Sequence, residues 1–179
     1  MNSNNIVLPE NWSVEGEYLL RLLPDVWQET LSRELDAPRK VPASPYYRFA
    51  SRGKLPNQLN AGEGSYYPLR SYFIASRTSL ISAEDVYETA LKLVRALKPL
   101  HQAGLMHGSL TPDAVLIHPD KDLRIIQWAF CNSPADLASR LPNWFLPGLV
   151  NYLSPEQSGK TSFKPGLTSD IYEIGRAHV

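Results

Sequence analysis

One stretch of the chain, residues 107–129, constrains the fold more than any other. It opens with a polar loop at His107, continues with the apolar run Val115–Ile117 and crosses a short charged turn. It then resumes with Leu123–Ile126, which is apolar except for Arg124. Short apolar runs bounded by turn residues predict β-strands, and two in succession predict a hairpin. The segment Gln127–Ala129 follows directly. The sequence therefore predicts a loop, a strand, a turn, a second strand and a second loop, in that order.

This order resembles the catalytic centre of the protein kinases, in which H-R-D-L-x-x-x-x-N, a strand, a turn, a second strand and D-F-G follow one another. The positions that carry the resemblance are His107, Leu110, Pro112 and the run Val115–Ile117. The resemblance implies an α+β, protein-kinase-like fold with a mainly helical C-lobe, truncated here, and an abbreviated small lobe. A chance match of a β-hairpin is the alternative, and the downstream motifs argue against it.

The charged residues of the family's pattern are replaced at four positions. Ser109 stands for the proton-accepting aspartate, Thr111 for the phosphate-contacting lysine, Ala114 for the metal-binding asparagine, and Gln127 for the metal-binding aspartate of D-F-G. A positioned general base typically contributes roughly 10²–10⁴-fold to a rate, and magnesium is usually bound through carboxylates. The resemblance therefore implies a catalytically inactive domain, a pseudokinase, with no cofactor and no metal. ATP and magnesium are expected only if the chain is an active kinase.

Two further motifs lie downstream. Residues 148–157 resemble the family's G-T-x-x-Y-x-A-P-E, with Glu156 as the closing glutamate. The arginine that pairs with this glutamate in the family has no counterpart here, so we expect an unpaired charge and an exposed apolar surface. Asp170 matches the aspartate that opens the large C-lobe helix and bonds back to the catalytic loop, although Ser169 and Asp170 also suit a simple helix cap.

The resemblance implies a set of structural residues that hold the loop and the core without doing chemistry: His107, Trp128, Glu156 and Asp170. The remaining histidines, at 101, 118 and 178, have no partner at metal-binding spacing. The single cysteine, Cys131, can form no disulfide within the chain and is interpreted as a small buried residue in a reducing compartment.

A long amphipathic helix is predicted before the loop. Ser82 is a good N-cap with Asp85 three residues later, and apolar residues recur at helical spacing from Val86 to Leu100. Gly104 is a typical residue just past a helix end. Pro99 predicts a kink or an early end of this helix.

The N-terminal part carries weaker signals. Residues 26–35 predict a helix in which Glu29 or Glu34 could match the kinase helix glutamate, although each is expected to be an ordinary exposed charge. Residues 36–70 are rich in proline, glycine, serine and tyrosine and predict mostly loop. Tyr72–Ile74 predicts the strand that leads into the kinase hinge.

Composition narrows the class of protein. The 179 residues are 43% hydrophobic and 20% charged, which suits one globular domain. Eighteen basic residues balance eighteen acidic ones, so the charge predicts no nucleic-acid partner and no contact of this segment with a membrane. The first residues, Met1–Asn5, lack the features of a signal peptide. We therefore expect a cytoplasmic location.

The sequence divides into a degenerate small lobe and hinge (1–76), a partial kinase-like C-lobe (77–173) and a candidate non-native tail (174–179). The tail resembles the translation of a common sequencing adapter. Because the chain stops where the central C-lobe helix should begin, we expect it to be a fragment of a longer protein.

The phrase at residues 152–160, followed by residues 168–172, resembles the degenerate kinase-like domain of large fungal hybrid sensor histidine kinases and related bacterial kinases. This implies a regulatory or scaffolding module in signal transduction, which acts on a neighbouring phosphorelay domain or a protein partner. Two alternatives stay open. One is an active ATP-dependent serine/threonine protein kinase, for which Asp113 and Asp136 are the nearest spare carboxylates. The other is an inert fragment.

Overall fold

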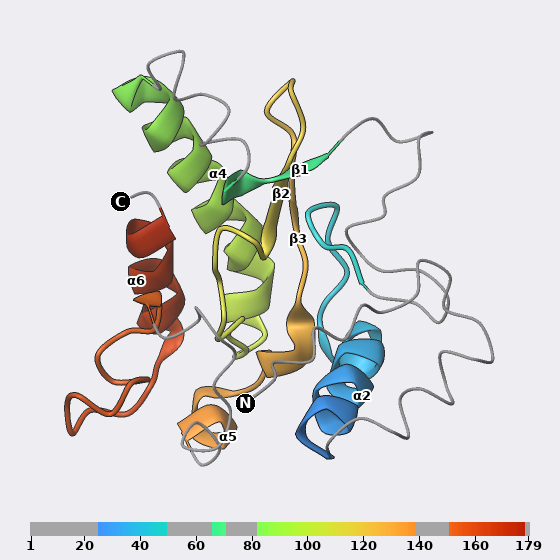
Figure 1. Cartoon of the computed structure of the whole chain (residues 1–179), viewed down its shortest axis with the longest axis vertical. Coiled ribbons are helices and arrows are strands. Elements are labelled where there is room, and N and C mark those ends of the chain that lie inside the picture. The colour runs from blue at the N-terminus through green and yellow to red at the C-terminus, as the bar shows by residue number, and fades with distance from the viewer. Residues whose placement is uncertain (1–24, 50–65, 71–81, 139–150, 178–179) are drawn as a thin grey trace, which may run out of the picture.

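The computed structural model describes residues 25–49, 66–70, 82–138 and 151–177 (Figure 1). Its elements, in chain order, are helix α2 (Asp25–Lys40), strand β1 (Tyr67–Pro68), helix α4 (Ala83–Gln102), strands β2 (Val115–Ile117) and β3 (Leu123–Ile125), the 3-10 helix η2 (Trp128–Phe130), and helices α5 (Pro134–Ala138) and α6 (Leu167–Ala177). The mixture of helices with a small sheet confirms the predicted α+β class.

The predicted hairpin is confirmed and forms two strands of an antiparallel sheet in the order β1-β2-β3. Val115 pairs with Ile125 and Ile117 with Leu123 across the hairpin, while Tyr67 of β1 pairs with Ile117 on the other edge. All three residues of β2 are buried. A strand that is buried on both faces has a continuous apolar sequence, as Val115–Ile117 does.

The capping residues of helix α4, Ser82 at the start and Gly104 just past the end, are those that the sequence predicts. The Ser82 hydroxyl accepts a hydrogen bond from the Asp85 backbone N–H at 3.0 Å, and the Asp85 carboxylate accepts one from the Ser82 backbone N–H at 3.4 Å, which completes a capping box. Gly104 has a φ of 72°. The backbone N–H groups of Gly104 and Leu105 donate to carbonyls of the last turn, as in a Schellman motif.

Two helix ends differ from the prediction. Pro99 does not end α4 early, since the helix continues to Gln102. Helix α2 passes its predicted end at Leu35 and continues to Lys40 with Pro38 inside, so the first residues of the predicted loop are helical. In both helices the proline lies in the last turn, where it removes one hydrogen bond and tertiary packing of the helix outweighs the loss.

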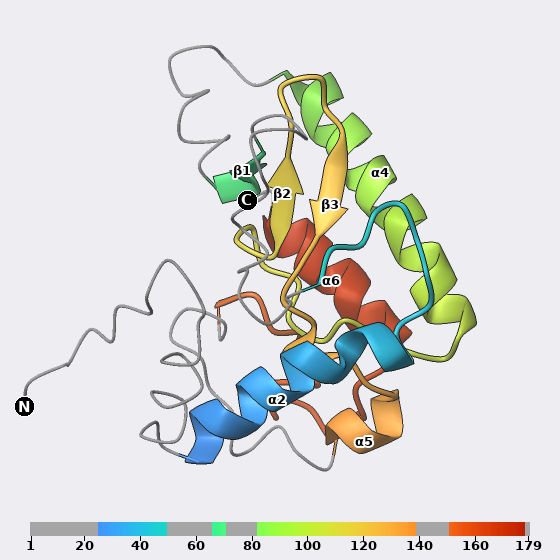
Figure 2. The same cartoon turned by 90° about the vertical axis from the view of Figure 1, so that its right-hand side faces the viewer.

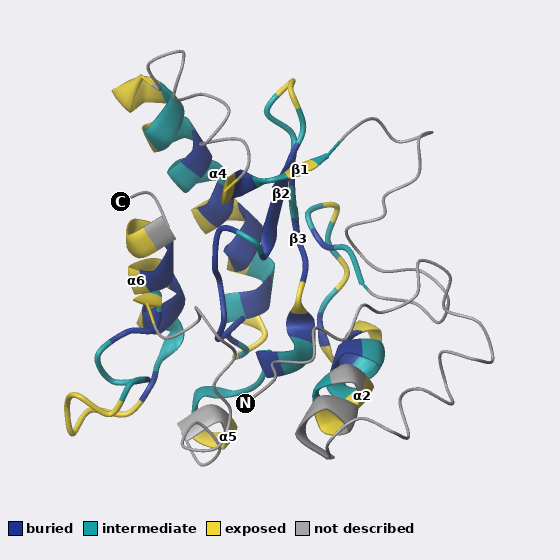
Figure 3. Ribbon diagram, viewed as in Figure 1, coloured by how far each residue is buried: buried dark blue, intermediate teal, exposed yellow. Residues whose placement is uncertain are grey.

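The core lies where α4, the hairpin and α6 meet. Figure 1 shows α4 beside the hairpin with α6 on its other side, and Figure 2 shows α2 below the C-terminal end of β3. Buried residues gather on the facing sides of these elements (Figure 3). Leu93, Leu97 and Leu100 supply the stripe of α4 that packs against Ile125 and Ile174.

Several predictions concern residues outside the described ranges. These include the strand at Tyr72–Ile74, the small-lobe residues before Asp25, and most of the segment between η2 and residue 151. Helix α6 extends through Ile174 to Ala177, residues that the sequence assigns to the candidate tail. Among the helices that the structure describes, none combines the length and the apolar character needed to cross a bilayer.

The packing of α4 predicts a sharp contrast between two aliphatic residues of this helix. Leu97→Ala should lower the free energy of unfolding by about 2–5 kcal/mol, because the side chain is fully buried and its removal leaves a cavity. Val94→Ala is the matched control, since Val94 is 42% exposed and the same truncation should cost no more than about 0.5 kcal/mol. Urea denaturation measures both; equal losses would contradict the packing.

Candidate functional site

The loop from His107 to Ala114, which the sequence aligns with a kinase catalytic loop, connects the end of α4 to β2. All of its residues except one are buried. Backbone hydrogen bonds in both directions join Met106 to Asn132, at 2.9 and 3.1 Å. The segment that enters the loop therefore lies beside the segment that leaves η2, so residues 107–114 and 127–130 form one centre.

Asp170, in the first turn of α6, holds the start of the loop. Its Oδ2 accepts a hydrogen bond from the His107 backbone N–H and its Oδ1 accepts one from the Gly108 backbone N–H, both at 2.9 Å. The Nε2 atom of His101 lies 2.8 Å from Oδ2. The Asp170 side chain is fully buried. It satisfies backbone donors that an irregular loop cannot pair within itself.

Glu173, one turn further along α6, holds the middle of the loop. Its Oε2 accepts a hydrogen bond from the Leu110 backbone N–H at 2.7 Å, and its Oε1 accepts one from the Gln157 side-chain amide at 3.0 Å. Gln157 also donates to the Gly108 carbonyl at 3.3 Å. Burial, and after it the charge of Asp170, raises the pKa of Glu173 to about 8.

His107 and Trp128 pack edge to face beneath the loop, with ring centroids 5.0 Å apart. Trp128 also packs against Tyr47 at 4.6 Å, and its indole N–H donates to the Arg48 carbonyl at 2.7 Å. The Nε2 atom of His107 lies 2.9 Å from the Ile126 carbonyl, which can only accept, so the proton is on Nε2. Burial lowers the pKa of His107. This histidine is therefore a neutral packing residue.

The four substituted positions provide no carboxylate. Ser109, Thr111 and Ala114 are buried, and the Ser109 hydroxyl has no hydrogen-bond partner within the described residues. Gln127 is exposed, has a φ of 67°, and donates from its side-chain amide to the Asp113 carbonyl at 3.3 Å. The amide of Gln127 thus contacts the loop backbone where the kinase pattern has a metal ligand.

Both spare carboxylates near the loop have partners. The Nε atom of Arg70 lies 3.0 and 2.9 Å from the two carboxylate oxygens of Asp113, and an Nη2–H of the same guanidinium donates to the Tyr152 hydroxyl at 3.3 Å. Asp136 accepts a hydrogen bond from the Ser133 hydroxyl at 2.7 Å at the start of α5. Neither carboxylate is left without a protein partner.

Glu156 forms no ion pair with a residue that the structure describes, but its carboxylate is hydrogen-bonded. Its Oε1 accepts a hydrogen bond from the Ser169 hydroxyl at 2.6 Å. Because Ser169 immediately precedes Asp170 in α6, a neutral hydroxyl on the same helix partly takes the place of the arginine that the kinase pattern supplies.

The two glutamates of α2 differ in environment. Glu29 is exposed and pairs with Arg33 on the same helix, as expected. Glu34 is buried, which corrects the expectation of an exposed charge. Burial raises the pKa of Glu34 to about 7, and the backbone N–H groups of Ala129 and Trp128 act in the opposite direction. Glu34 therefore faces η2, beside the substituted D-F-G position.

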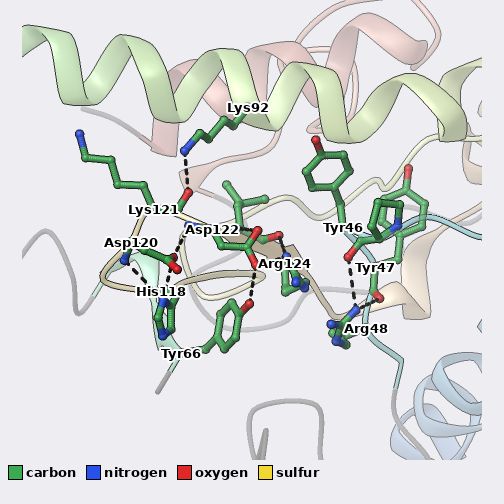
Figure 4. Close-up of polar contacts among 12 residues, drawn as sticks. Tyr46, Tyr47, Arg48, Tyr66, Lys92, His118, Asp120, Lys121, Asp122 and Arg124 are labelled. Carbon is green, nitrogen blue, oxygen red and sulfur yellow. Dashed lines mark hydrogen bonds and ion pairs between the residues drawn. The ribbon is translucent and has the colours of Figure 1, made fainter. Parts of the chain in front are cut away.

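Polar contacts on both sides fix the turn between β2 and β3 (Figure 4). The Tyr66 hydroxyl donates to Asp122 Oδ2 at 2.6 Å, and Arg124 pairs with the same oxygen at 2.5 Å. Lys92 of α4 donates to the Lys121 carbonyl at 2.7 Å, and the Lys121 ammonium pairs with two acidic residues near the start of α4. The hairpin that carries the loop is thereby attached to α4 and to β1.

In the described ranges, no group of three His, Cys, Asp or Glu side chains is placed to hold a metal ion. Cys131 is partly buried, and burial raises the pKa of its thiol to about 12, so little reactive thiolate forms at neutral pH. His118 contacts the Asp120 carboxylate at 2.6 Å in the hairpin turn. His178 lies outside the residues that the structure describes.

Sequence reasoning missed four residues that organise this centre: Arg70, His101, Gln157 and Glu173. The sequence carries a signal for one of them. Glu173 follows Asp170 by three residues, a spacing that places both on the same face of a helix. Arg70 had none, since 43 residues separate it from Asp113.

Serine/threonine-protein kinase PknA of Mycobacterium tuberculosis is 29% identical to this chain over 108 residues, which are 60% of this chain and 24% of PknA. Serine/threonine-protein kinase PknL of the same species is 33% identical over 79 residues, 44% of this chain and 19% of PknL. Serine/threonine-protein kinase PLK4 of Nematostella vectensis is 27% identical over 108 residues, 58% of this chain and 10% of PLK4.

No family model matches the chain. The chain is similar to serine/threonine protein kinases. The aligned residues span about a quarter or less of each of these relatives. The similarity supports a protein-kinase-like domain, in agreement with the order of loop, hairpin and second loop.

The hydrogen bonds of Asp170 predict that Asp170→Asn strongly destabilises the fold. Asp170→Asn keeps the size of the side chain but directs an amide N–H₂ group at a backbone N–H donor and removes the charge. We expect the free energy of unfolding to fall by about 3 kcal/mol or more, since a buried donor loses its partner. Asp120→Asn, in the exposed hairpin turn, is the matched control and should lower the free energy of unfolding much less. Chemical denaturation measures the free energy of unfolding of both variants. Similar losses would exclude the role of Asp170 as the anchor of the loop.

Proposed function

We propose that this chain is a catalytically inactive protein-kinase-like domain, a pseudokinase, that acts as a regulatory or scaffolding module in signal transduction. The observation that carries the proposal is the ion pair between Arg70 and Asp113. It engages Asp113, the one acid within residues 107–114, so this carboxylate is already occupied and does not stand in for the missing base or metal ligands.

The environment of Ser109 supports the same proposal. A serine hydroxyl is not a proton acceptor at neutral pH, and it becomes reactive only when a His, Asp or Glu side chain within hydrogen-bond reach takes its own proton. The Ser109 hydroxyl is buried and makes no hydrogen bond to any described residue. His107 directs Nε2 to the Ile126 carbonyl. The position therefore lacks an activating partner.

The role of the domain is inferred from its resemblance rather than from a ligand. Residues 152–160 and 168–172 resemble the kinase-like domain of hybrid sensor histidine kinases, in which catalysis belongs to other domains. We propose that this chain is part of such a sensor kinase, works in the cytoplasm, and acts through contacts with a neighbouring domain or a protein partner. ATP and magnesium have no role in this proposal.

The second candidate is an active ATP-dependent serine/threonine protein kinase, which the names of the similar proteins favour. It needs a base and metal ligands from residues other than Ser109, Ala114 and Gln127. The two candidates differ in whether nucleotide and magnesium bind, so a binding measurement separates them.

Nucleotide binding is predicted to be absent. In a thermal-shift titration of the full chain, 1 mM ATP should leave the melting temperature unchanged, both with magnesium and without it. A site with a Kd of about 10 µM would stabilise the folded state by about 2.7 kcal/mol under these conditions, which is on the order of 5 °C or more. A cooperative melt without ligand is the control. A magnesium-dependent rise would favour the active kinase.

Restoring two carboxylates should not restore activity. Ser109→Asp with Gln127→Asp supplies an aspartate at the base position and one at the metal position, but the phosphate-contacting lysine and the metal-binding asparagine stay replaced. We expect no transfer of labelled phosphate from ATP to a protein substrate or to the chain itself. The single variants show whether each aspartate is tolerated in the fold. Transfer above that of the unaltered chain would refute the proposal.

A further inference from the structure

The anchor of the loop on α6 consists of two carboxyl groups one helical turn apart. Asp170 accepts hydrogen bonds from the backbone N–H groups of His107 and Gly108, and Glu173 accepts one from that of Leu110. Both side chains are completely buried. Three of the four backbone donors from 107 to 110 therefore depend on two buried acids of the same helix.

Little positive charge compensates this pair. On α4, His101 contacts Asp170 but not Glu173 in the hydrogen bonds that the structure describes. On the loop, the ring of His107 is neutral, because burial lowers its pKa. The segment before α6 supplies the neutral amide of Gln157 and a third acid, Glu156, whose charge also acts on Glu173. No lysine or arginine in the described ranges forms an ion pair with either α6 carboxylate.

Two ionised carboxylates in one buried pocket are costly, so such a pair retains a proton near neutral pH. Glu173 is the member that retains it, since burial and the charge of Asp170 raise its pKa to about 8. A neutral carboxyl group can still accept the hydrogen bonds from Leu110 and Gln157.

We propose that α6 and the 107–110 loop form a proton-controlled latch, in which a proton held on the Asp170–Glu173 pair keeps the loop docked and its release undocks the loop. The proton passes to solvent as Glu173 ionises. The repulsion between the two carboxylates is then relieved when the loop leaves α6 and water enters the pocket. The latch does not depend on whether the chain is catalytic.

The sign of the pH dependence follows from linkage. Glu173 has a higher pKa in the docked state than in an open, hydrated state, where an ordinary glutamate value of about 4.3 applies. Docking is therefore strongest at low pH and weakens as pH rises towards 8. Between pH 6 and 8 the equilibrium constant for opening should increase by about tenfold per pH unit.

Amide hydrogen exchange of the full chain, measured by NMR between pH 6 and 8 and corrected for intrinsic rates, tests the latch. The amides of His107, Gly108 and Leu110 should lose protection by about tenfold per pH unit. They should also exchange faster than the amide of Leu97 in the core of α4, because the opening is local. Glu173→Gln keeps a hydrogen-bond acceptor without a charge, so its loop amides should show constant protection. Glu29→Gln, on the exposed side of α2, is the matched control and should keep the slope.

Three outcomes would overturn the proposal. The first is constant protection of the loop amides in the unaltered chain. The second is the same slope in the unaltered chain and in the Glu173→Gln variant. The third is exchange of the loop amides at the rate of the Leu97 amide, since opening would then be global unfolding and no latch would exist.

Discussion

The centre of this molecule depends on the hydrogen bonds between the Asp170 carboxylate and the backbone of the 107–110 loop. The loop has no regular secondary structure, yet it is buried, so each of its N–H groups needs a partner other than water. Asp170 and Glu173 supply those partners from α6 for His107, Gly108 and Leu110. Because the contacts go to the backbone, the conformation of the loop does not depend on the side chains that would perform catalysis.

Because of this independence, the loop can carry Ser109, Thr111 and Ala114 while its backbone stays anchored on α6. Ser109 and Ala114 are small and lie in positions with almost no exposure to solvent. A carboxylate at Ser109 would have to be buried beside Asp170 and Glu173, which already form an acidic pair with little compensating charge. A small neutral side chain at position 109 is therefore compatible with close packing of the loop on α6.

Sequence reasoning succeeded where the signal was local. The hairpin followed from two apolar runs, and both ends of α4 followed from Ser82 with Asp85 and from Gly104, because caps are set by a few neighbouring residues. It failed where burial depended on distant segments. Nothing near Glu34 in the sequence shows that η2, some ninety residues later, covers it. The extension of α2 through Pro38 has the same origin, since packing against η2 overrides a local stop signal.

The contact between α2 and η2 follows the same principle as the contact between α6 and the loop. In the kinase pattern the helix glutamate pairs with a lysine of a small-lobe strand. Glu34 instead faces the backbone N–H groups of Ala129 and Trp128, with apolar contacts around it. Trp128 is thus held between α2, the Arg48 carbonyl and the ring of His107. Acidic side chains directed at backbone donors therefore hold both sides of this centre.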